Sequence, residues 1–483
     1  MDLIILFLCL LILFSSGYVL FLQKKVKYPP CITGWIPWFG AAFQFGKAPL
    51  DFIAQARAKY GPVFTVFAAG KRLTFVTCHK DFRTFFTSKD VDFEQAVQEP
   101  VYHTASISKE SFYRFHPACN PLIKGKLTQA QAQLSGHLCE EFNTHLALLG
   151  RSGSGELCDL VRAAMYPAVI SNLLGKRNSP NSPAAVREFI EMFRTYDEGF
   201  EHGSQLPDIF LRDWAKSKQW LLSLLNRMVM RARGSEPSEA STETLLQRLM
   251  ATVTDRFLPN YALLMLWASL ANAIPITFWA VAFILSHPSA YQKAMEQIST
   301  ALKDQSTDRT SVSAAELQRT PYVKCCILEA IRLRAPGAIT RRVVRPLQIQ
   351  NYIIPPGDLL MLSPYWAHRN PQFFPDPEEF WPERWEKADL EKNVFLEGFV
   401  AFGGGRNQCP GSPHPGISWD PGNAIIRGLQ GDRMAGGSLR CSAQGWDKKT
   451  IPSCRCSPGS EAPATDITLL ERLPEFIPAL RNM

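Results

Sequence analysis

The sequence Phe402-Gly403-Gly404-Gly405-Arg406-Asn407-Gln408-Cys409-Pro410-Gly411 places one cysteine at the end of a glycine-rich loop. Because glycine has no side chain, a backbone of this kind can approach a flat group closely. A cysteine thiolate can bind the iron of haem, and backbone N–H groups that point at the sulfur spread its charge. The pattern predicts that Cys409 is the axial ligand of a haem iron.

Two other interpretations fit the loop when it is taken alone. The chain has 12 cysteines, and a cysteine is often a small buried apolar residue. The three consecutive glycines also suit a turn or a phosphate-binding loop, although the Gly-Lys-Ser/Thr ending of a P-loop is missing. Other motifs in the chain therefore have to distinguish these possibilities.

A second motif combines one acidic and two basic residues. Glu329 and Arg332 lie three residues apart in the segment 325–333, so a helix there would place both on one face. Arg384 follows in the sequence Pro-Glu-Arg-Trp. A Glu-x-x-Arg pair alone carries little information, because composition yields about one in a chain of this length. The three are informative together, since burying one charge without the others is costly.

These motifs resemble the cytochrome P-450 superfamily, whose cysteine loop has the pattern that Phe402, Gly405, Cys409 and Gly411 fill. The resemblance implies a mainly α fold with a small β region and a single catalytic domain over residues 29–411. It also implies that Phe402, Gly403 and Gly405 bind the cofactor beside Cys409, and that Glu329, Arg332 and Arg384 form a buried ionic network beneath the haem.

Within the superfamily the chain resembles the sterol 7α-hydroxylases most, through the segments 29–38, 59–67 and 351–385. This resemblance implies a monooxygenase that hydroxylates an oxysterol, 24-hydroxycholesterol, in cholesterol catabolism and bile-acid synthesis. The implied cofactors are haem b, dioxygen and NADPH-derived electrons that arrive through a flavoprotein reductase.

The long apolar stretch 260–286 suits either a membrane-spanning helix or a buried core helix. Ser269, Asn272 and Pro275 interrupt it, and a polar, helix-breaking cluster of this kind indicates a local distortion at a functional site. In the family this is the helix that crosses the distal face of the haem, which favours the core interpretation.

The usual acid–threonine pair of that helix is absent from this chain. Asn272 donates and accepts hydrogen bonds without titrating, so we expect it to position an ordered water in the active site, with Thr277 as a second catalytic candidate. The alternative is that Asn272 bonds a neighbouring carbonyl. Prostacyclin synthase has a similar helix and isomerises a peroxide without external electrons, so an isomerase of that kind remains an alternative function.

The two haem carboxylates require basic partners. Arg341 falls where the family places such a residue, and Arg406 and Lys124 are further candidates. Arg406 is shifted by one position, because Asn407 stands where the superfamily often has arginine. A single basic residue is more often solvated than bound to a ligand.

The N-terminus predicts a membrane anchor. Residues 3–22 are mostly apolar and long enough to cross a bilayer as one helix, and Lys24, Lys25 and Lys27 follow them. Positive charge on this side indicates that it stays cytoplasmic. With the family's location, this predicts a single-pass protein of the endoplasmic reticulum membrane with a cytoplasmic catalytic domain.

The net charge of +8 suits anionic lipid heads or an acidic protein partner such as the reductase. We find no basic–aromatic repeat, zinc spacing or recognition motif, so nucleic acid is not an expected partner. Helix starts are predicted at 48–53 and 312–317, and strands at 64–67 and 73–76.

Residues 412–483 depart from the family, whose members continue from the loop into a helix beneath the haem. Three prolines follow within ten residues of Gly411, and proline is incompatible with a regular helix interior. The remainder is rich in Gly, Ser, Pro and Arg without an apolar period, which predicts disorder. A third possible function is therefore an inactive, membrane-tethered splice product that cannot hold haem.

Overall fold

The computed structural model of the protein describes most of the chain between residues 27 and 409. The described residues are 27–119, 122, 155–175, 177–180, 182–234, 244–302, 319–335, 337–388, 398–409, 439–443 and 454–458. The predicted anchor at 3–22, Lys124 and the helix start at 312–317 lie outside them. Within the predicted disordered tail the structure describes only the strands β10 (Leu439–Ala443) and β11 (Cys454–Pro458), which pair antiparallel with each other.

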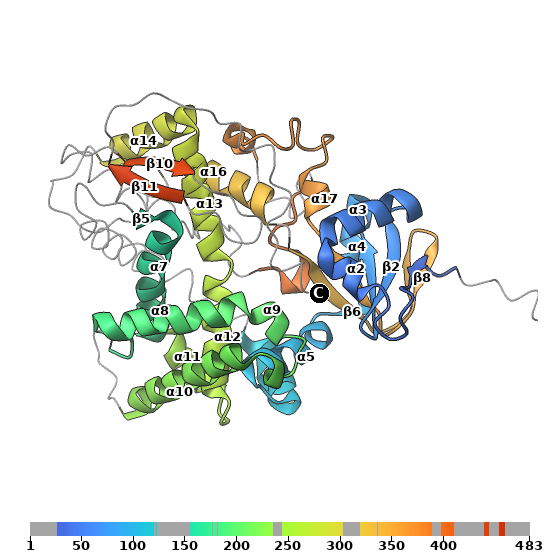
Figure 1. The fold of residues 1–483 in the computed structure, drawn as a ribbon, viewed down its shortest axis with the longest axis horizontal. Helices are drawn as coiled ribbons and strands as arrows, with labels where there is room; N and C mark the ends of the chain where they lie inside the picture. The colour runs from blue at the N-terminus through green and yellow to red at the C-terminus, as the bar shows by residue number, and fades with distance from the viewer. Residues whose placement is uncertain are drawn as a thin grey trace, which may run out of the picture.

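The described chain is mainly helical with a small β region, as the sequence predicted. Figure 1 shows the large helices on one side and the main sheet, covered by short helices, on the other. The large helices are α7 (Leu157–Leu174), α8 (Pro183–Glu198), α10 (Arg212–Gly234), α11 (Leu245–Thr252), α12 (Leu258–Leu270), α13 (Ala273–Ser286), α14 (Pro288–Leu302) and α16 (Pro321–Arg334). The shorter helices are α2 (Ala42–Lys47), α3 (Pro49–Tyr60), α4 (Phe82–Thr87), α5 (Glu94–Ala105), α9 (Phe200–Gly203) and α17 (Tyr365–His368). Four 3₁₀ turns complete the described helices: η1 (His79–Asp81), η2 (Asp208–Phe210), η3 (Pro382–Trp385) and η5 (Gly405–Asn407).

The main sheet has the strand order β1-β2-β3-β9-β6-β4. Its strands are β1 (Cys31–Ile32), β2 (Val63–Ala68), β3 (Lys71–Val76), β9 (Leu359–Leu362), β6 (Ile339–Val343) and β4 (Val91–Asp92). Two smaller sheets contain β7 (Leu347–Ile349) with β8 (Tyr352–Ile354), and β5 (Gly155–Glu156) with β10 and β11.

Both predicted strands near the N-terminus are confirmed as the hairpin of β2 and β3. Ala69 and Gly70 connect them with positive φ angles of 48° and 75°, the conformation that a two-residue hairpin turn requires. The predicted helix start at 48–53 is confirmed as α3, which has Pro49 in its first turn and ends at Gly61 with φ of 90°.

The predicted distortion of the stretch 260–286 is confirmed, because α12 ends at Leu270 and α13 begins at Ala273. Pro275 has no N–H, so it cannot donate to the carbonyl of Ala271 four residues earlier. Ser269 adds to the distortion by donating from Oγ to the carbonyl of Met265 at 2.8 Å.

The pair α12 and α13 forms the centre of the helical core. By length and apolar composition, α7 and the pair α12–α13 are the helices in the described part that could cross a membrane. The pair instead packs against α7, α10 and α16, and most of its large apolar side chains are buried in the main core cluster. We conclude that it is a core helix with a break.

A buried carboxylate connects α8 to α12. Asp197 accepts a hydrogen bond from Trp267 Nε1 at 2.9 Å, and the Trp267 ring stacks on Phe200 with centroids 3.5 Å apart. Burial raises the pKa of Asp197 to about 6 from an ordinary value of 3.8. The charged carboxylate therefore costs stability at neutral pH, while its hydrogen bond holds the two helices together.

Replacing Asp197 by Asn should remove this pH-dependent cost and keep an acceptor for Trp267. Between pH 4 and 6 the folded protein holds a proton that the unfolded chain has released, so wild-type stability falls as the pH rises. The Asp197→Asn variant should therefore gain about 2–3 kcal/mol relative to wild type between pH 4 and 7. Urea unfolding at each pH measures the difference in free energy of unfolding between the variant and the wild type. Trp267→Phe, which keeps the carboxylate, should retain the wild-type slope, and a constant Asp197→Asn difference across pH would contradict the assignment.

Candidate functional site

The cysteine loop is closed by backbone hydrogen bonds at both ends. The Cys409 N–H donates to the Phe402 carbonyl at 2.9 Å, and the Gly403 N–H donates to the Val400 carbonyl at 2.9 Å. The short 3₁₀ turn η5 lies between these bonds. Cys409 itself is exposed and forms no disulfide within the described part of the chain.

Two glycines of the loop have the left-handed backbone conformation that favours glycine. Gly403 has φ of 66° and Gly405 has φ of 69°. A Cβ atom at Gly405 would also lie 2.5 Å from the carbonyl oxygen of Phe86 in α4, which is closer than atoms can approach. Glycine at 405 is thus required by both the backbone angle and the close contact with α4.

Arg341 contacts the aromatic rings of the same helix, α4. It extends from β6, is only 4% exposed, and its guanidinium lies 4.9 Å from the Phe93 ring and 5.9 Å from the Phe86 ring. Its Nη1 donates to the Thr340 carbonyl, but among the described residues no carboxylate forms an ion pair with it. Burial lowers the pKa of Arg341 to about 10; the nearby Glu94 carboxylate opposes this shift, and the charge of Arg406 adds to it.

These residues fit a haem. A buried guanidinium without a carboxylate partner among the described residues is costly, and a haem carboxylate would supply the missing charge. The exposed Cys409 thiol and the close approach of the loop to α4 suit a thiolate ligand on a flat macrocycle. Phe86 contacts both Arg341 and Gly405, so the two parts of the site share one neighbour.

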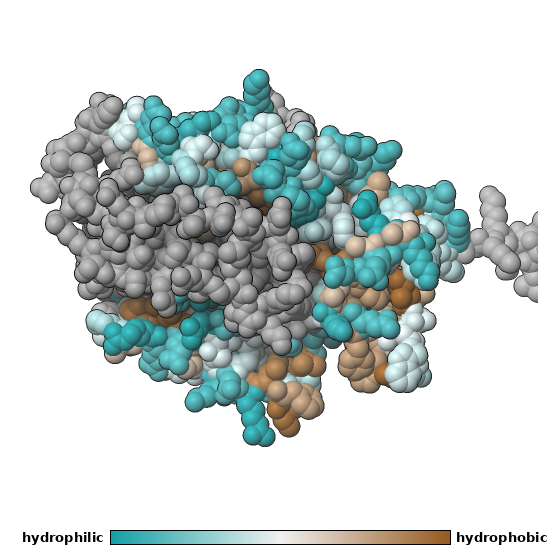
Figure 2. Space-filling view, turned by 45° about the horizontal axis from the view of Figure 1, so that its top comes forward, coloured by the Kyte–Doolittle hydropathy of each residue, from teal (hydrophilic) through white to brown (hydrophobic). Residues whose placement is uncertain are grey.

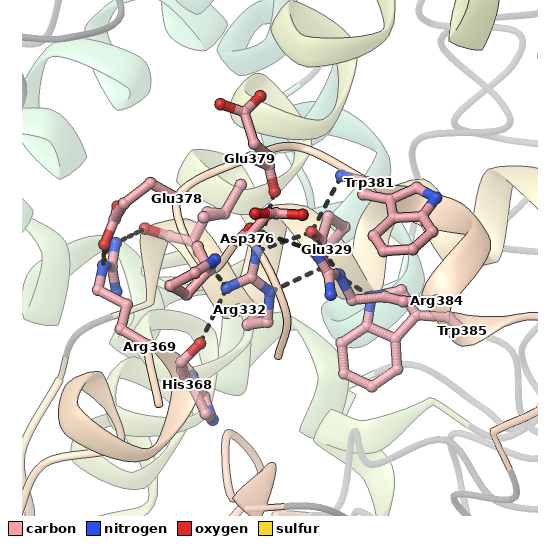
Figure 3. A network of polar contacts seen from close by, with 12 residues as sticks. Glu329, Arg332, His368, Arg369, Asp376, Glu378, Glu379, Trp381, Arg384 and Trp385 are labelled. Carbon is pink, nitrogen blue, oxygen red and sulfur yellow. Dashed lines mark hydrogen bonds and ion pairs between the residues drawn. The ribbon is translucent and has the colours of Figure 1, made fainter. Parts of the chain in front are cut away.

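The structure also brings together the three predicted charged residues. Figure 3 shows Glu329 between Arg332 and Arg384. Arg332 donates from Nη2 to Glu329 Oε1 at 2.7 Å and from Nε to Oε2 at 2.9 Å, while Arg384 Nε donates to Oε1 at 3.1 Å. The Glu329 and Arg332 side chains are fully buried. The pair is therefore bidentate and shielded from water.

Sequence reasoning missed the remaining donors around Glu329. Trp385 Nε1 donates to Glu329 Oε2 at 2.8 Å, and the Trp381 N–H donates to Oε1 at 3.1 Å. Arg332 in turn donates to three backbone carbonyls, those of His368, Pro377 and Glu379. The network thereby joins α16 to the segment 368–385, which leads toward the cysteine loop.

Replacing Glu329 by Gln should destabilise the protein by about 3–5 kcal/mol, because it leaves the buried Arg332 guanidinium without its counter-charge. Denaturant unfolding followed by circular dichroism measures the loss. Glu379→Gln is the matched control, since only the Glu379 carbonyl contacts Arg332 and its side chain is exposed. Equal stability of the two variants would show that the network contributes nothing.

The broken helix presents one exposed face. Ala268, Asn272 and Pro275 are exposed although most of their neighbours in α12 and α13 are buried. Their spacing of four and three residues places them on one side of the helix. Thr277 lies off this face, is 2% exposed, and its Oγ1 has no hydrogen-bond partner among the described residues. Asn272 is thus available to a bound molecule, whereas Thr277 is enclosed.

The other predicted site residues have different surroundings. Arg406 is largely exposed, and its Nη2 lies 3.9 Å from Glu94 Oε2, so it forms a surface ion pair. Phe402 is partly buried, with its ring 6.2 Å from that of Phe399. A Cβ at Gly403 would meet the Phe86 ring at 3.6 Å. Lys124 lies outside the described residues.

Comparison with known proteins identifies the class of protein. The family model described as Cytochrome P450 matches residues 29–413, and the chain therefore belongs to the cytochrome P450 family. The family binds haem b and uses dioxygen with electrons from a redox partner.

Two curated relatives refine this result. A protein named 24-hydroxycholesterol 7-alpha-hydroxylase from Mus musculus is 48% identical over 406 residues, which cover 83% of this chain and 85% of that protein. The protein of the same name from Homo sapiens is 48% identical over 398 residues, with 81% and 85% covered. The solved structure of retinoic acid bound cyanobacterial CYP120A1 shares the fold, with a TM-score of 0.66 and 19% identity over 90% of this chain and all of that one.

Proposed function

We propose that the protein is a haem-thiolate monooxygenase that hydroxylates an oxysterol, 24-hydroxycholesterol, at its 7α position. The choice of substrate is supported by the 48% identity to two relatives named 24-hydroxycholesterol 7-alpha-hydroxylase over more than four fifths of the chain. The site supports the reaction class, because Cys409 is exposed at the end of a closed, glycine-requiring loop. This activity belongs to cholesterol catabolism and bile-acid synthesis.

The residues have distinct roles in this proposal. Cys409 would bind the haem iron, Arg341 would bind a haem carboxylate, and Glu329 with Arg332 and Arg384 would hold the segment 368–385 against α16. When bound, haem supplies the activation of dioxygen. Asn272 orients a water or hydroxyl by donating from its amide N–H₂ and accepting at its carbonyl oxygen.

The test combines membranes that contain the protein with NADPH, the reductase and a panel of oxysterols. The proposal predicts a product heavier by one oxygen, formed from 24-hydroxycholesterol in preference to the other sterols, and a thiolate-type Soret band in the reduced carbon monoxide difference spectrum. Cys409→Ser should abolish both. Turnover of a peroxide without reductase would instead show an isomerase, and absence of the band in wild type would show the inactive product.

The residues beyond the cysteine loop keep open the alternative that the protein is an inactive splice product that cannot hold haem. The family match ends at residue 413, close to the boundary of the catalytic domain that the sequence predicts at 411. We propose that residues 412–483 supply no haem-binding residue, although β10 and β11 within them form a sheet with β5 of the catalytic domain. The same carbon monoxide spectrum, recorded on the full chain, measures whether haem is retained.

Asn272→Leu should lower kcat by about tenfold to a hundredfold, because the exposed face of the broken helix loses its only amide while the volume is kept. Product formation and NADPH consumption, measured together, should show fewer hydroxylations for each NADPH. Thr277→Val is the matched control: Thr277 is enclosed, so kcat should change by less than about threefold. If Asn272→Leu retained wild-type coupling, Asn272 would have no part in the reaction.

We also propose that the protein lies on the endoplasmic reticulum membrane, anchored by residues 3–22. The described residues that follow this segment support a lipid contact. Trp35 is 86% exposed, Trp38 60% and Phe43 64%, and the ring of Phe39 contacts those of Trp38 and Phe43. Figure 2 shows hydrophobic residues at the surface on the side that carries the main sheet. Amphipathic tryptophans favour the membrane interface.

Lipids with brominated chains should quench the fluorescence of these tryptophans. In vesicles of such lipids, the variant Trp35→Phe/Trp38→Phe should lose at least about half of the wild-type quenching. Trp381→Phe, which removes an exposed tryptophan from the segment that borders Glu329, should lose much less. Equal losses in the two variants would argue against a lipid contact at Trp35 and Trp38.

A further inference from the structure

His368 connects the ionic network to the chain that precedes the cysteine loop. Its backbone carbonyl accepts a hydrogen bond from Arg332 Nη1 at 2.8 Å. Its side-chain Nε2 accepts a hydrogen bond from the Val400 N–H at 3.2 Å. Val400 lies 32 residues further along the chain, so a single residue bridges two distant segments. Figure 3 shows its carbonyl directed at Arg332.

The surroundings of His368 fix the state of its ring. The residue is fully buried, and burial with the charges of Arg369 and Arg332 lowers its pKa to about 3. The ring is therefore neutral, and because Nε2 accepts from Val400, the proton is on Nδ1. The ring also stacks on Phe399, with centroids 4.9 Å apart and an angle of 22°. Both the hydrogen bond and the stacking hold the chain at 399–400.

Val400 is itself part of the loop's closure. Its carbonyl accepts the hydrogen bond from Gly403, two residues before Gly405, and Phe402 accepts the hydrogen bond from Cys409. Without the bond to His368, the buried Val400 N–H would lack this acceptor, and among the described residues packing alone would hold the start of the loop. The position of Cys409 thus depends on where Val400 is held.

We infer that His368 is a positioning residue for the thiolate ligand: its imidazole holds Val400 while its carbonyl is held by Arg332, so that the cysteine loop is kept in register with the buried ionic network. His368 does not touch the reacting atoms. The inference rests on the proposed role of Cys409 as the haem ligand, and it assigns to His368 a role that a buried aromatic residue could not replace, because an acceptor atom is required.

Three variants separate positioning from packing. His368→Leu keeps an apolar side chain and removes the acceptor, whereas His368→Gln places an amide oxygen where it can accept from Val400. Phe374→Leu is the packing control, because the buried Phe374 ring lies edge-on to His368 at 6.4 Å and 5.1 Å from the Arg332 guanidinium, so the variant loosens packing against both without removing an acceptor. All are made in the full chain.

The first measurement is hydrogen exchange at the Val400 amide. Its protection relative to the mean of other core amides should fall about tenfold in His368→Leu, return in His368→Gln and stay unchanged in Phe374→Leu. The second is the share of haem that shows the thiolate-type band with carbon monoxide. This share should fall at least about twofold in His368→Leu relative to Phe374→Leu, and His368→Gln should restore it.

Two results would overturn the inference: unchanged Val400 protection in His368→Leu, or equal thiolate shares in His368→Leu and Phe374→Leu. If His368→Leu did not fold, His368→Gln would decide alone, because retention of both the protection and the band supports an acceptor role and loss of either refutes it. Absence of the thiolate-type band in the wild-type protein would refute the role of Cys409 as the haem ligand, and His368 could then not position that ligand. Hydrogen exchange at the Val400 amide would still show whether His368 accepts its hydrogen bond.

Discussion

The structure depends above all on the neutralisation of one buried carboxylate. Glu329 has no contact with water, and its two oxygens accept from Arg332, Arg384, Trp385 and the Trp381 backbone. A carboxylate in such surroundings is tolerated only when charge and hydrogen bonds compensate its lost hydration. Because its partners come from α16 and from the segment 381–385 that contains the 3₁₀ turn η3, satisfying this one group holds η3 against α16.

The same principle organises the cofactor side. Arg341 is buried among the rings of Phe85, Phe86 and Phe93, which offer a cation favourable faces but no full counter-charge. In the proposed role of Arg341, a haem carboxylate would offset the stability cost of this buried charge. Glu329 is compensated within the chain, whereas we propose that a haem carboxylate compensates Arg341.

Local patterns allowed much of this fold to be predicted. The position of Pro49 predicted the start of α3, and the interruption by Ser269, Asn272 and Pro275 predicted the break between α12 and α13. The resemblance to the family predicted the cysteine loop and the network of three charged residues. Trp385, His368 and Asp197 were not identified, because their roles depend on partners 32 to 70 residues away in the sequence. His368 ends the four-residue helix α17 and Trp385 ends the short 3₁₀ turn η3, and elements this short carry no periodic signal that would reveal such a partner.

The contact between Gly405 and Phe86 affects how the loop can be studied and how it can vary. Any side chain at 405 would have to displace the main chain of α4, which is a rigid obstacle rather than a flexible neighbour. An alanine scan of this loop would therefore record a backbone collision at 405 as if it were a loss of ligand chemistry. For an engineer, the Phe86 side chain can be varied where Gly405 cannot, because the collision at 405 is with the Phe86 backbone carbonyl.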